Sequence, residues 1–240
     1  MKKIICILTT VALSVSLLYA CGANKSAGNA DKTKKGNGLG EITVVSREDG
    51  SGTRGSFVEL MKITDDRGND ATYDGAEITN STSVMLTTVS GNKNAVGYVS
   101  LGSLSSDVKA VFVDGAEATT ENVKSGKYKI SRPFNVCYKD GSLSALAQDF
   151  LNFIISDEGQ KIIDKEGYIS VEAGKSYKAS GLKGKISLAG STSVSPVMEV
   201  LADEYKKLNP NVTIEIQQNG SSAGISSAIE GVCDLGMSSR

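Results

Sequence analysis

Three short turns rich in glycine and hydroxyl side chains carry the residue types best suited to binding an anion. They span residues 46–53, 190–195 and 219–224, and each follows an expected strand and precedes an expected helix. The first backbone N–H groups of a helix lack intrahelical partners and lie at the positive end of the helix dipole. Serine and threonine hydroxyls add donors, and glycine allows close approach to a ligand. Together the turns predict a site for a tetrahedral oxyanion, although each alone is also typical of an ordinary turn.

Arg47 and a fourth cluster, residues 238–240, extend this set of anion-binding groups. Arg47 lies in the first turn, and its guanidinium offers several charged donors in a fixed geometry. The 238–240 cluster follows the last expected strand. In α/β sheets, ligands bind at the carboxyl ends of strands, beside helix N-termini. If the four segments converge there, they form a cage of N–H and O–H donors with Arg47 as the principal charge.

The segment 220–224 (GSSAG) also matches the G-x-S-x-G pattern of hydrolases, with Ser222 as the nucleophile. A serine nucleophile needs a general base, and the chain contains no histidine. No lysine stands at an S-x-x-K spacing near these turns. The composition therefore disfavours a serine hydrolase, which we keep as an alternative. The acidic residues and cysteines show no metal-ligand spacing, so we expect neither a metal nor a cofactor.

Strands and helices are expected to alternate along most of the chain. The expected strands cover residues 41–45, 76–79, 94–101, 108–113, 131–138, 185–189, 212–216 and 234–237. The expected helices cover residues 55–63, 81–90, 121–125, 144–155, 157–165, 197–208 and 225–231, with Asn80 or Ser81 as the cap of the second. This alternation predicts an α/β fold with largely parallel sheets.

The N-terminal 40 residues predict export and a membrane tether. Residues 1–20 place two lysines before a short apolar core that ends in Leu-Tyr-Ala, directly before Cys21. This pattern resembles a bacterial lipoprotein signal peptide with Cys21 as the lipidated residue; an ordinary signal peptide with an incidental cysteine is the alternative. Residues 21–40 are rich in Gly, Lys, Ala, Asn and Ser and predict a flexible tether. The expected location is extracytoplasmic and lipid-anchored at the cell membrane.

The overall charge and the two remaining cysteines constrain the function less than these motifs do. The formal net charge of −1 provides no surface-wide field that would attract nucleic acid, so we expect no nucleic-acid partner. Cys137 and Cys233 lie in apolar surroundings and are expected to be small buried side chains. A disulfide between them stays open.

Several motifs together resemble one protein family, the phosphate-binding lipoproteins of bacterial phosphate ABC transporters. The motifs are 47–53 (REDGSGT), 94–100 (NAVGYVS), 131–134 (SRPF), 156–160 (SDEGQ) leading to 166–168 (EGY), 190–196 (GSTSVSP), 220–224 (GSSAG) and 236–240 (GMSSR). The likeness covers nearly everything after the tether. It implies a two-lobed type II periplasmic-binding-protein-like fold that closes on phosphate, a non-enzymatic function and ABC transporter permease subunits as partners.

The resemblance also implies which residues bind phosphate. The implied ligands are Thr192, Ser193, Ser221 and Ser239 from one lobe and Arg47, Ser51, Gly52 and Thr53 from the other. Some family members carry an aspartate where this chain has Ser239, and that carboxylate would accept the proton of hydrogen phosphate. Asp49 is the nearby substitute as proton acceptor, with pairing to Arg47 as its alternative role.

The order of the segments departs from that family. The part equivalent to residues 185–240 comes first in the family, and the part equivalent to residues 41–172 follows after a connecting stretch that has no visible copy here. The fold is therefore expected to be permuted and incomplete in the second lobe. The expected divisions are 41–107 as the partial second lobe with the anion-binding loop, 108–172 as the C-terminal-type half of the first lobe, 173–184 as a linker and 185–240 as the N-terminal-type half of the first lobe. The alternative function is a truncated or recombined family fragment with weak or no ligand binding.

Overall fold

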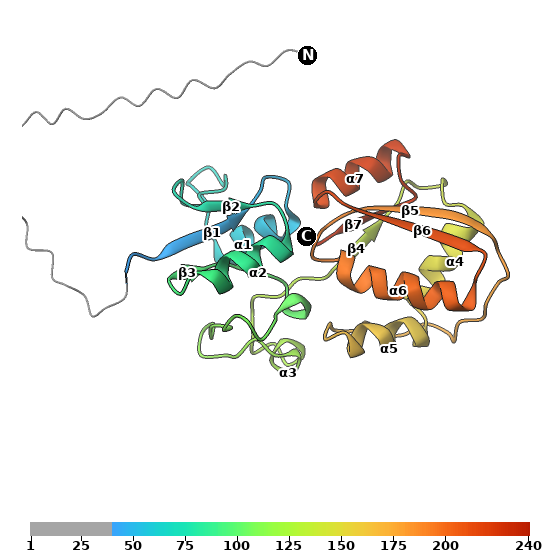
Figure 1. The fold of residues 1–240 in the computed structure, drawn as a ribbon, viewed down its shortest axis with the longest axis horizontal. Helices are drawn as coiled ribbons and strands as arrows, with labels where there is room; N and C mark the ends of the chain where they lie inside the picture. The colour runs from blue at the N-terminus through green and yellow to red at the C-terminus, as the bar shows by residue number, and fades with distance from the viewer. Residues whose placement is uncertain (1–39) are drawn as a thin grey trace, which may run out of the picture. The chain divides into compact units, whose positions relative to one another are not determined.

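The computed structural model describes residues 40–240, which form two β-sheets with helices around them (Figure 1). The predicted signal peptide, Cys21 and the tether as far as residue 39 lie outside the described residues. The succession of strands and helices confirms the predicted α/β class. We refer to residues 43–96 as the first-sheet region and to residues 135–240 as the second-sheet region.

The first sheet contains three short parallel strands in the order β2-β1-β3. Its central strand is β1 (Thr43–Arg47), with β2 (Glu77–Thr79) and β3 (Ala95–Val96) on either side. Helix α1 (Gly52–Met61) follows β1, and helix α2 (Thr82–Gly91) follows β2. Because the strands are parallel, their carboxyl ends lie at the same edge of the sheet, where both helices begin.

The second sheet contains four strands in the order β4-β7-β5-β6. Its strands are β4 (Asn135–Cys137), β5 (Gly184–Gly190), β6 (Val212–Gln218) and β7 (Leu235–Ser238). Strands β5, β6 and β7 are parallel, and β4 is antiparallel to β7. Helices α6 (Ser195–Leu208) and α7 (Ser221–Glu230) connect the parallel strands. Figure 1 shows α7 on one face of this sheet and α6 on the other.

The main hydrophobic core lies between the second sheet and helices α4 (Ala145–Ile154) and α6. The apolar side of α4 includes Phe150 and Phe153, whose spacing puts both rings on the face toward the core. Phe150 meets Tyr205 of α6 edge-on, with ring centroids 5.0 Å apart. Burying one such aromatic side chain stabilises the fold by roughly 1.5–3 kcal/mol. Helix α5 (Asp157–Lys165) packs beside this layer.

The predicted linker, residues 173–184, has no helix or strand as far as residue 183, where β5 follows, but it is held by side-chain contacts. The Tyr177 hydroxyl donates to Asp149 Oδ2 at 2.6 Å, and the Tyr205 hydroxyl donates to the same oxygen at 2.7 Å. The Tyr177 N–H and the Ser176 hydroxyl donate to the Glu158 carboxylate at 2.7 and 2.8 Å. These contacts attach the linker to α4 and α5 before β5 begins, and Tyr205 of α6 shares the Asp149 oxygen with it.

Several sequence-based boundaries differ from the structure. The strand expected over 108–113 is wrong: this segment is a loop with a single bridge between Val113 and Ala116. Val111 and Phe112 are exposed there, because the loop has no adjacent strand to pair with. The strand expected over 94–101 is reduced to β3. Helices α1 and α7 begin inside the glycine-rich turns, three and four residues before their expected starts.

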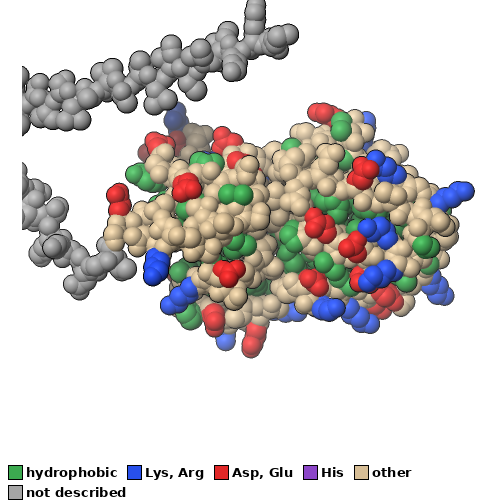
Figure 2. Space-filling view, in the orientation of Figure 1, with side chains coloured by type: hydrophobic (Ala, Val, Ile, Leu, Met, Phe, Trp, Pro, Cys, Tyr) green, Lys and Arg blue, Asp and Glu red, His purple; other side chains and the backbone are tan. Residues whose placement is uncertain are grey.

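The remaining described segments are short or lie at the surface. A 3-10 turn covers Leu101–Ser103, and helix α3 covers Thr120–Lys124. Within residues 40–240, no helix is long and apolar enough to cross a bilayer. Cys137 and Cys233 are free thiols that pack in one small cluster, and burial raises the pKa of both. Acidic and basic side chains are interspersed on the visible surface (Figure 2).

Candidate functional site

Helices from both sheet regions begin at one place, and hydroxyl side chains near their first turns bond to one another. Thr53 Oγ1 in α1 lies 2.8 Å from Ser193 Oγ, which precedes α6. Thr82 Oγ1 in α2 lies 3.1 Å from the same Ser193 oxygen. All three residues are buried. Helix N-termini supply unpaired N–H groups and a positive potential, so their meeting point favours an anion.

Ser239, directly after β7, lies at the centre of these contacts. Its Oγ lies 2.9 Å from Ser191 Oγ, 3.3 Å from Thr53 Oγ1 and 3.4 Å from Ser221 Oγ. The predicted turns and the 238–240 segment therefore do meet. We call the resulting group the hydroxyl cluster; its members are Thr53, Thr82, Ser191, Thr192, Ser193, Ser221 and Ser239, all buried.

Hydrogen-bond directions give the hydroxyl cluster its polarity. Thr192 Oγ1 accepts from the Arg47 guanidinium at 3.0 Å, and Ser221 Oγ accepts from the Ser239 backbone N–H at 3.1 Å. A hydroxyl that accepts an N–H directs its own O–H away from that donor. These oxygens therefore offer O–H groups as donors, which is the polarity that an oxyanion requires.

Arg47, at the end of β1, is the buried cation of the first-sheet region, with 1% of its surface exposed. Its Nε and Nη2 donate to the Glu48 carboxylate at 2.8 and 2.9 Å, while Nη2 also reaches Thr192. The Tyr98 hydroxyl accepts from the Arg47 backbone N–H at 3.2 Å. Burial raises the pKa of Tyr98, and its ring stacks on Phe57 at a centroid distance of 4.1 Å. Hydrogen bonds therefore hold both the backbone and the guanidinium of Arg47 in place.

Two glycines of the first turn allow the sheet regions to approach each other. A Cβ at Gly52 would collide with the Ser221 hydroxyl and would lie 2.9 Å from Ser239 Oγ. Gly50 has φ of +81°, a backbone conformation that favours glycine, and its carbonyl accepts from the Ser222 N–H at 3.1 Å. The first turn is thus both the N-terminus of α1 and a contact surface for α7.

The remaining sequence-predicted residues occupy different positions. Ser51 is the N-cap of α1, where its Oγ accepts from the Arg54 N–H at 3.3 Å. The Asp49 side chain is 97% exposed and pairs with Arg54 at 2.9 Å, so the structure does not bring it to the hydroxyl cluster. The alternative pairing of Asp49 with Arg47 is wrong, because Glu48 holds that position.

Ser222 does not have the surroundings of a nucleophile. Its Oγ accepts from Arg240 Nη2 at 2.9 Å, and its backbone N–H is bonded to Gly50. An arginine cannot act as a general base at neutral pH, since its guanidinium stays protonated. Among residues 40–240, no group of His, Cys, Asp and Glu side chains is arranged to hold a metal ion.

Two residues at the site lie outside all of the predicted turns, and sequence reasoning missed them. Thr82 joins the hydroxyl cluster from the start of α2, where the cap Ser81 was the available signal. Arg132 donates from Nη2 to Thr53 Oγ1 at 3.1 Å and from Nε to the Ser239 carbonyl. Arg132 belongs to the 131–134 motif of the family resemblance, but this extended segment has neither glycine nor a following helix, so its pattern did not assign Arg132 to the site.

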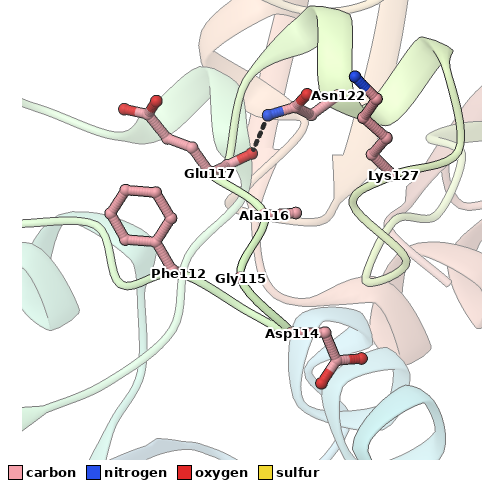
Figure 3. A pocket seen from close by; sticks show the side chains of 7 residues that line it. All are labelled: Phe112, Asp114, Gly115, Ala116, Glu117, Asn122 and Lys127. Atoms are coloured by element: carbon pink, nitrogen blue, oxygen red, sulfur yellow. Dashed lines mark hydrogen bonds between the residues drawn. The ribbon is translucent and has the colours of Figure 1, made fainter.

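A hollow with a volume of about 540 Å³ lies in the loop that includes α3 (Figure 3). Its lining includes Phe112, Asp114, Glu117, Asn122 and Lys127, and it shares no residue with the hydroxyl cluster. The Asn122 amide donates to the Glu117 carbonyl at 3.0 Å, which fixes the loop. Figure 3 shows the two acidic side chains pointing in different directions, so they do not converge on a ligand.

Two α/β regions that join helix N-termini, buried hydroxyls and arginines define a binding protein for a small oxyanion. A family model described as "PBP superfamily domain" matches residues 27–158 and 175–240. The chain belongs to this superfamily.

Relatives with known names agree with this class. The chain is 47% identical over 232 residues to "Phosphate-binding protein PstS 2" of Streptococcus agalactiae, covering 95% of this chain and 76% of that protein. It is 46% identical over 237 residues to the protein of the same name from Streptococcus pneumoniae, covering 97% and 79%. A crystal structure of a phosphate-binding protein of a phosphate ABC transporter from S. pneumoniae matches with a TM-score of 0.65 at 48% identity, covering 84% of this chain and 79% of that one.

Proposed function

We propose that this chain is an extracytoplasmic solute-binding protein that captures inorganic phosphate for an ABC importer. The observation that carries the proposal is the donor polarity of the hydroxyl cluster beside buried Arg47. The names of the relatives supply the ligand, because the cluster alone would suit any small tetrahedral oxyanion. In this function the protein is a carrier and performs no chemical step.

Phosphate would be held by hydrogen bonds from groups that already point toward one another. On binding, cluster hydroxyls such as Thr53, Ser193 and Ser239 would exchange their mutual bonds for bonds to phosphate oxygens. Ser51, Gly52, Thr192 and Ser221 complete the proposed ligand set, with backbone N–H groups at the starts of α1 and α7. Charge-assisted bonds from arginine are about twice as strong as neutral ones, so Arg47 would contribute most per contact.

Closure of the two sheet regions on the ligand would complete the mechanism. The groups that contact phosphate come from both regions, so the ligand would bridge them as in other proteins that close by a hinge. We further propose that permease subunits receive the closed form and that lipidated Cys21 keeps the protein at the membrane. The permuted segment order, the incomplete second lobe and the divisions at 41–107, 108–172, 173–184 and 185–240 remain part of this proposal.

Titration calorimetry with phosphate tests the function. We expect micromolar or tighter binding, and loss of at least about tenfold in affinity for Arg47→Ala, because a charged hydrogen bond contributes roughly 1.5–3 kcal/mol. The matched control is Arg67→Ala, since Arg67 lies in the same region but its side chain is 84% exposed. No heat at millimolar phosphate would instead support the alternative of a family fragment with weak or no binding.

A further inference from the structure

Arg132 reaches the hydroxyl cluster from outside all of the glycine-rich turns. It lies three residues before β4 and donates to two members of the cluster at once, the Thr53 hydroxyl and the Ser239 carbonyl. Its guanidinium carbon also lies 5.5 Å from the centre of the Phe134 ring, a distance that suits a cation–π contact. Three different contacts thus fix the position of this cation.

The charge of Arg132 is uncompensated, in contrast to its neighbours. Arg47 is paired with Glu48 at 2.8 Å, and Arg54 is paired with Asp49 and Asp70 at 2.9 and 2.7 Å. Within residues 40–240, no carboxylate lies within salt-bridge distance of Arg132. Burial lowers the pKa of Arg132 to about 10, so the side chain stays protonated at neutral pH.

A half-buried cation without a counter-ion is costly unless an anion approaches it. Thr53 provides the link to such an anion. Its Oγ1 accepts from Arg132 and therefore directs its own O–H into the cluster, toward Ser193. Arg132 thus polarises the donor that the first-sheet region presents to the ligand.

We infer that Arg132 is a second cation of the phosphate site, which acts through Thr53 and makes the site prefer the dianion over the monoanion. This inference rests on the proposed function. The interaction energy of two charges is proportional to each of them. Removing one positive charge therefore reduces the binding free energy of a dianion twice as much as that of a monoanion. In affinity, the fold-loss for the dianion is then the square of the fold-loss for the monoanion.

The test is the phosphate affinity of the whole protein on the acid and alkaline sides of the second ionisation of phosphate. For Arg132→Gln we expect a loss of roughly tenfold for the dianion and roughly threefold for the monoanion, each relative to the unchanged protein under the same conditions. Arg132→Lys keeps the charge and is expected to keep the dianion preference, even where its bond to the Ser239 carbonyl is lost.

Ser56→Ala provides the matched structural control. The Ser56 hydroxyl donates to the same Ser239 carbonyl at 3.0 Å but carries no charge. If Arg132 only anchored this carbonyl, Arg132→Gln would lose affinity equally for both phosphate ions, as Ser56→Ala is expected to do. That result would overturn the inference, as would a loss of dianion preference in Arg132→Lys.

Different results would contradict the role of Arg132 and the proposed function. Phosphate binding by the unchanged protein with unaltered affinity in Arg132→Gln would remove Arg132 from the site and leave the proposed function standing. Absence of phosphate binding by the unchanged protein in both ionisation states would overturn the proposed function and this inference together.

Discussion

The two sheet regions contribute similar groups to the site but differ sharply in how they are held together. The second-sheet region buries sixteen apolar residues in one continuous core around α4 and α6. The first-sheet region has three buried apolar side chains, Val45, Val58 and Met85. Its strands are five, three and two residues long, and apolar residues on them such as Ile78 and Val96 are about half exposed.

This contrast implies that the first-sheet region depends on the site for much of its order. Its buried polar groups bond across to the second-sheet region, as Arg47 does to Thr192 and as Thr53 does to Ser193. Buried polar groups cost free energy when they lose their partners. The well-packed second-sheet region therefore supports the weakly packed first-sheet region. A ligand that contacts both regions would stabilise the first-sheet region further.

Core truncations give the largest expected effect and test this contrast directly. Phe150→Ala in the second-sheet region should lower the free energy of unfolding by about 3–5 kcal/mol, because it removes a fully buried ring. Met85→Ala in the first-sheet region should cost about 2 kcal/mol, the low end for such a change, because Met85 is buried but belongs to neither hydrophobic cluster of the described residues. Urea unfolding measures both. Equal losses of unfolding free energy in the two variants would contradict the difference in packing between the two regions.

Glycine substitutions in α1 test the contact between the regions. Gly52→Ala places a methyl group 2.8 Å from Ser221 Cβ, so the regions must separate and phosphate affinity should fall by roughly tenfold or more. Gly55→Ala is the matched control in the same helix, since its methyl group would lie 3.8 Å from Arg240. That variant should keep its affinity and gain about 0.5–1 kcal/mol of stability. Calorimetry and thermal unfolding distinguish the two.

The smallest expected effect concerns the linker and the pH dependence of stability. Hydrogen bonds from the Tyr177 N–H and the Ser176 hydroxyl lower the pKa of Glu158 to about 2, from an ordinary value of 4.5. Because the pKa of Glu158 is lowered in the folded state, its contribution to the stability of the fold is present above pH 4.5 and is lost as the pH falls toward 2. Glu158→Gln should therefore flatten the acid limb of the stability curve.

The matched control for this prediction is the exposed Glu230, at the end of α7. Urea unfolding between pH 5 and pH 2 should show the original acid limb in Glu230→Gln. If Glu158→Gln retained the same slope, the carboxylate contacts of the linker would not contribute to stability, and the second-sheet region would be held by its core alone.

Local sequence patterns predicted the capped amphipathic helices better than the strands. The expected helix 157–165 has the observed bounds, and 144–155 differs by one residue at each end, because serine caps and a regular apolar side mark both. The expected strand 108–113 has the composition of a strand, but a strand also needs a partner. Pairing depends on tertiary structure, which β-branched composition alone cannot reveal.

The site was predictable where its chemistry coincides with turn chemistry. Residues 46–53, 190–195 and 219–224 were visible because glycine and serine before a helix have a recognisable pattern. The carboxylate beside Arg47 was not, since Glu48 and Asp49 are adjacent and of the same type. Only the backbone conformation of the turn decides that one points inward and the other into solvent. Arg132 shows the same limit, as its partners are 79 and 107 positions away.

The anchored linker has a consequence for the way this chain could be divided. Residues 178–181 are exposed, while Tyr177 just before them is bonded to Asp149 on α4. A cut between Lys178 and Ala179 would leave α4 and α5 on one fragment and β5, α6, β6, α7 and β7 on the other. The main core is formed by residues of both fragments. When the two fragments are co-expressed as separate chains, they should reassemble. Each fragment carries part of the oxyanion site, so ligand binding would report their association.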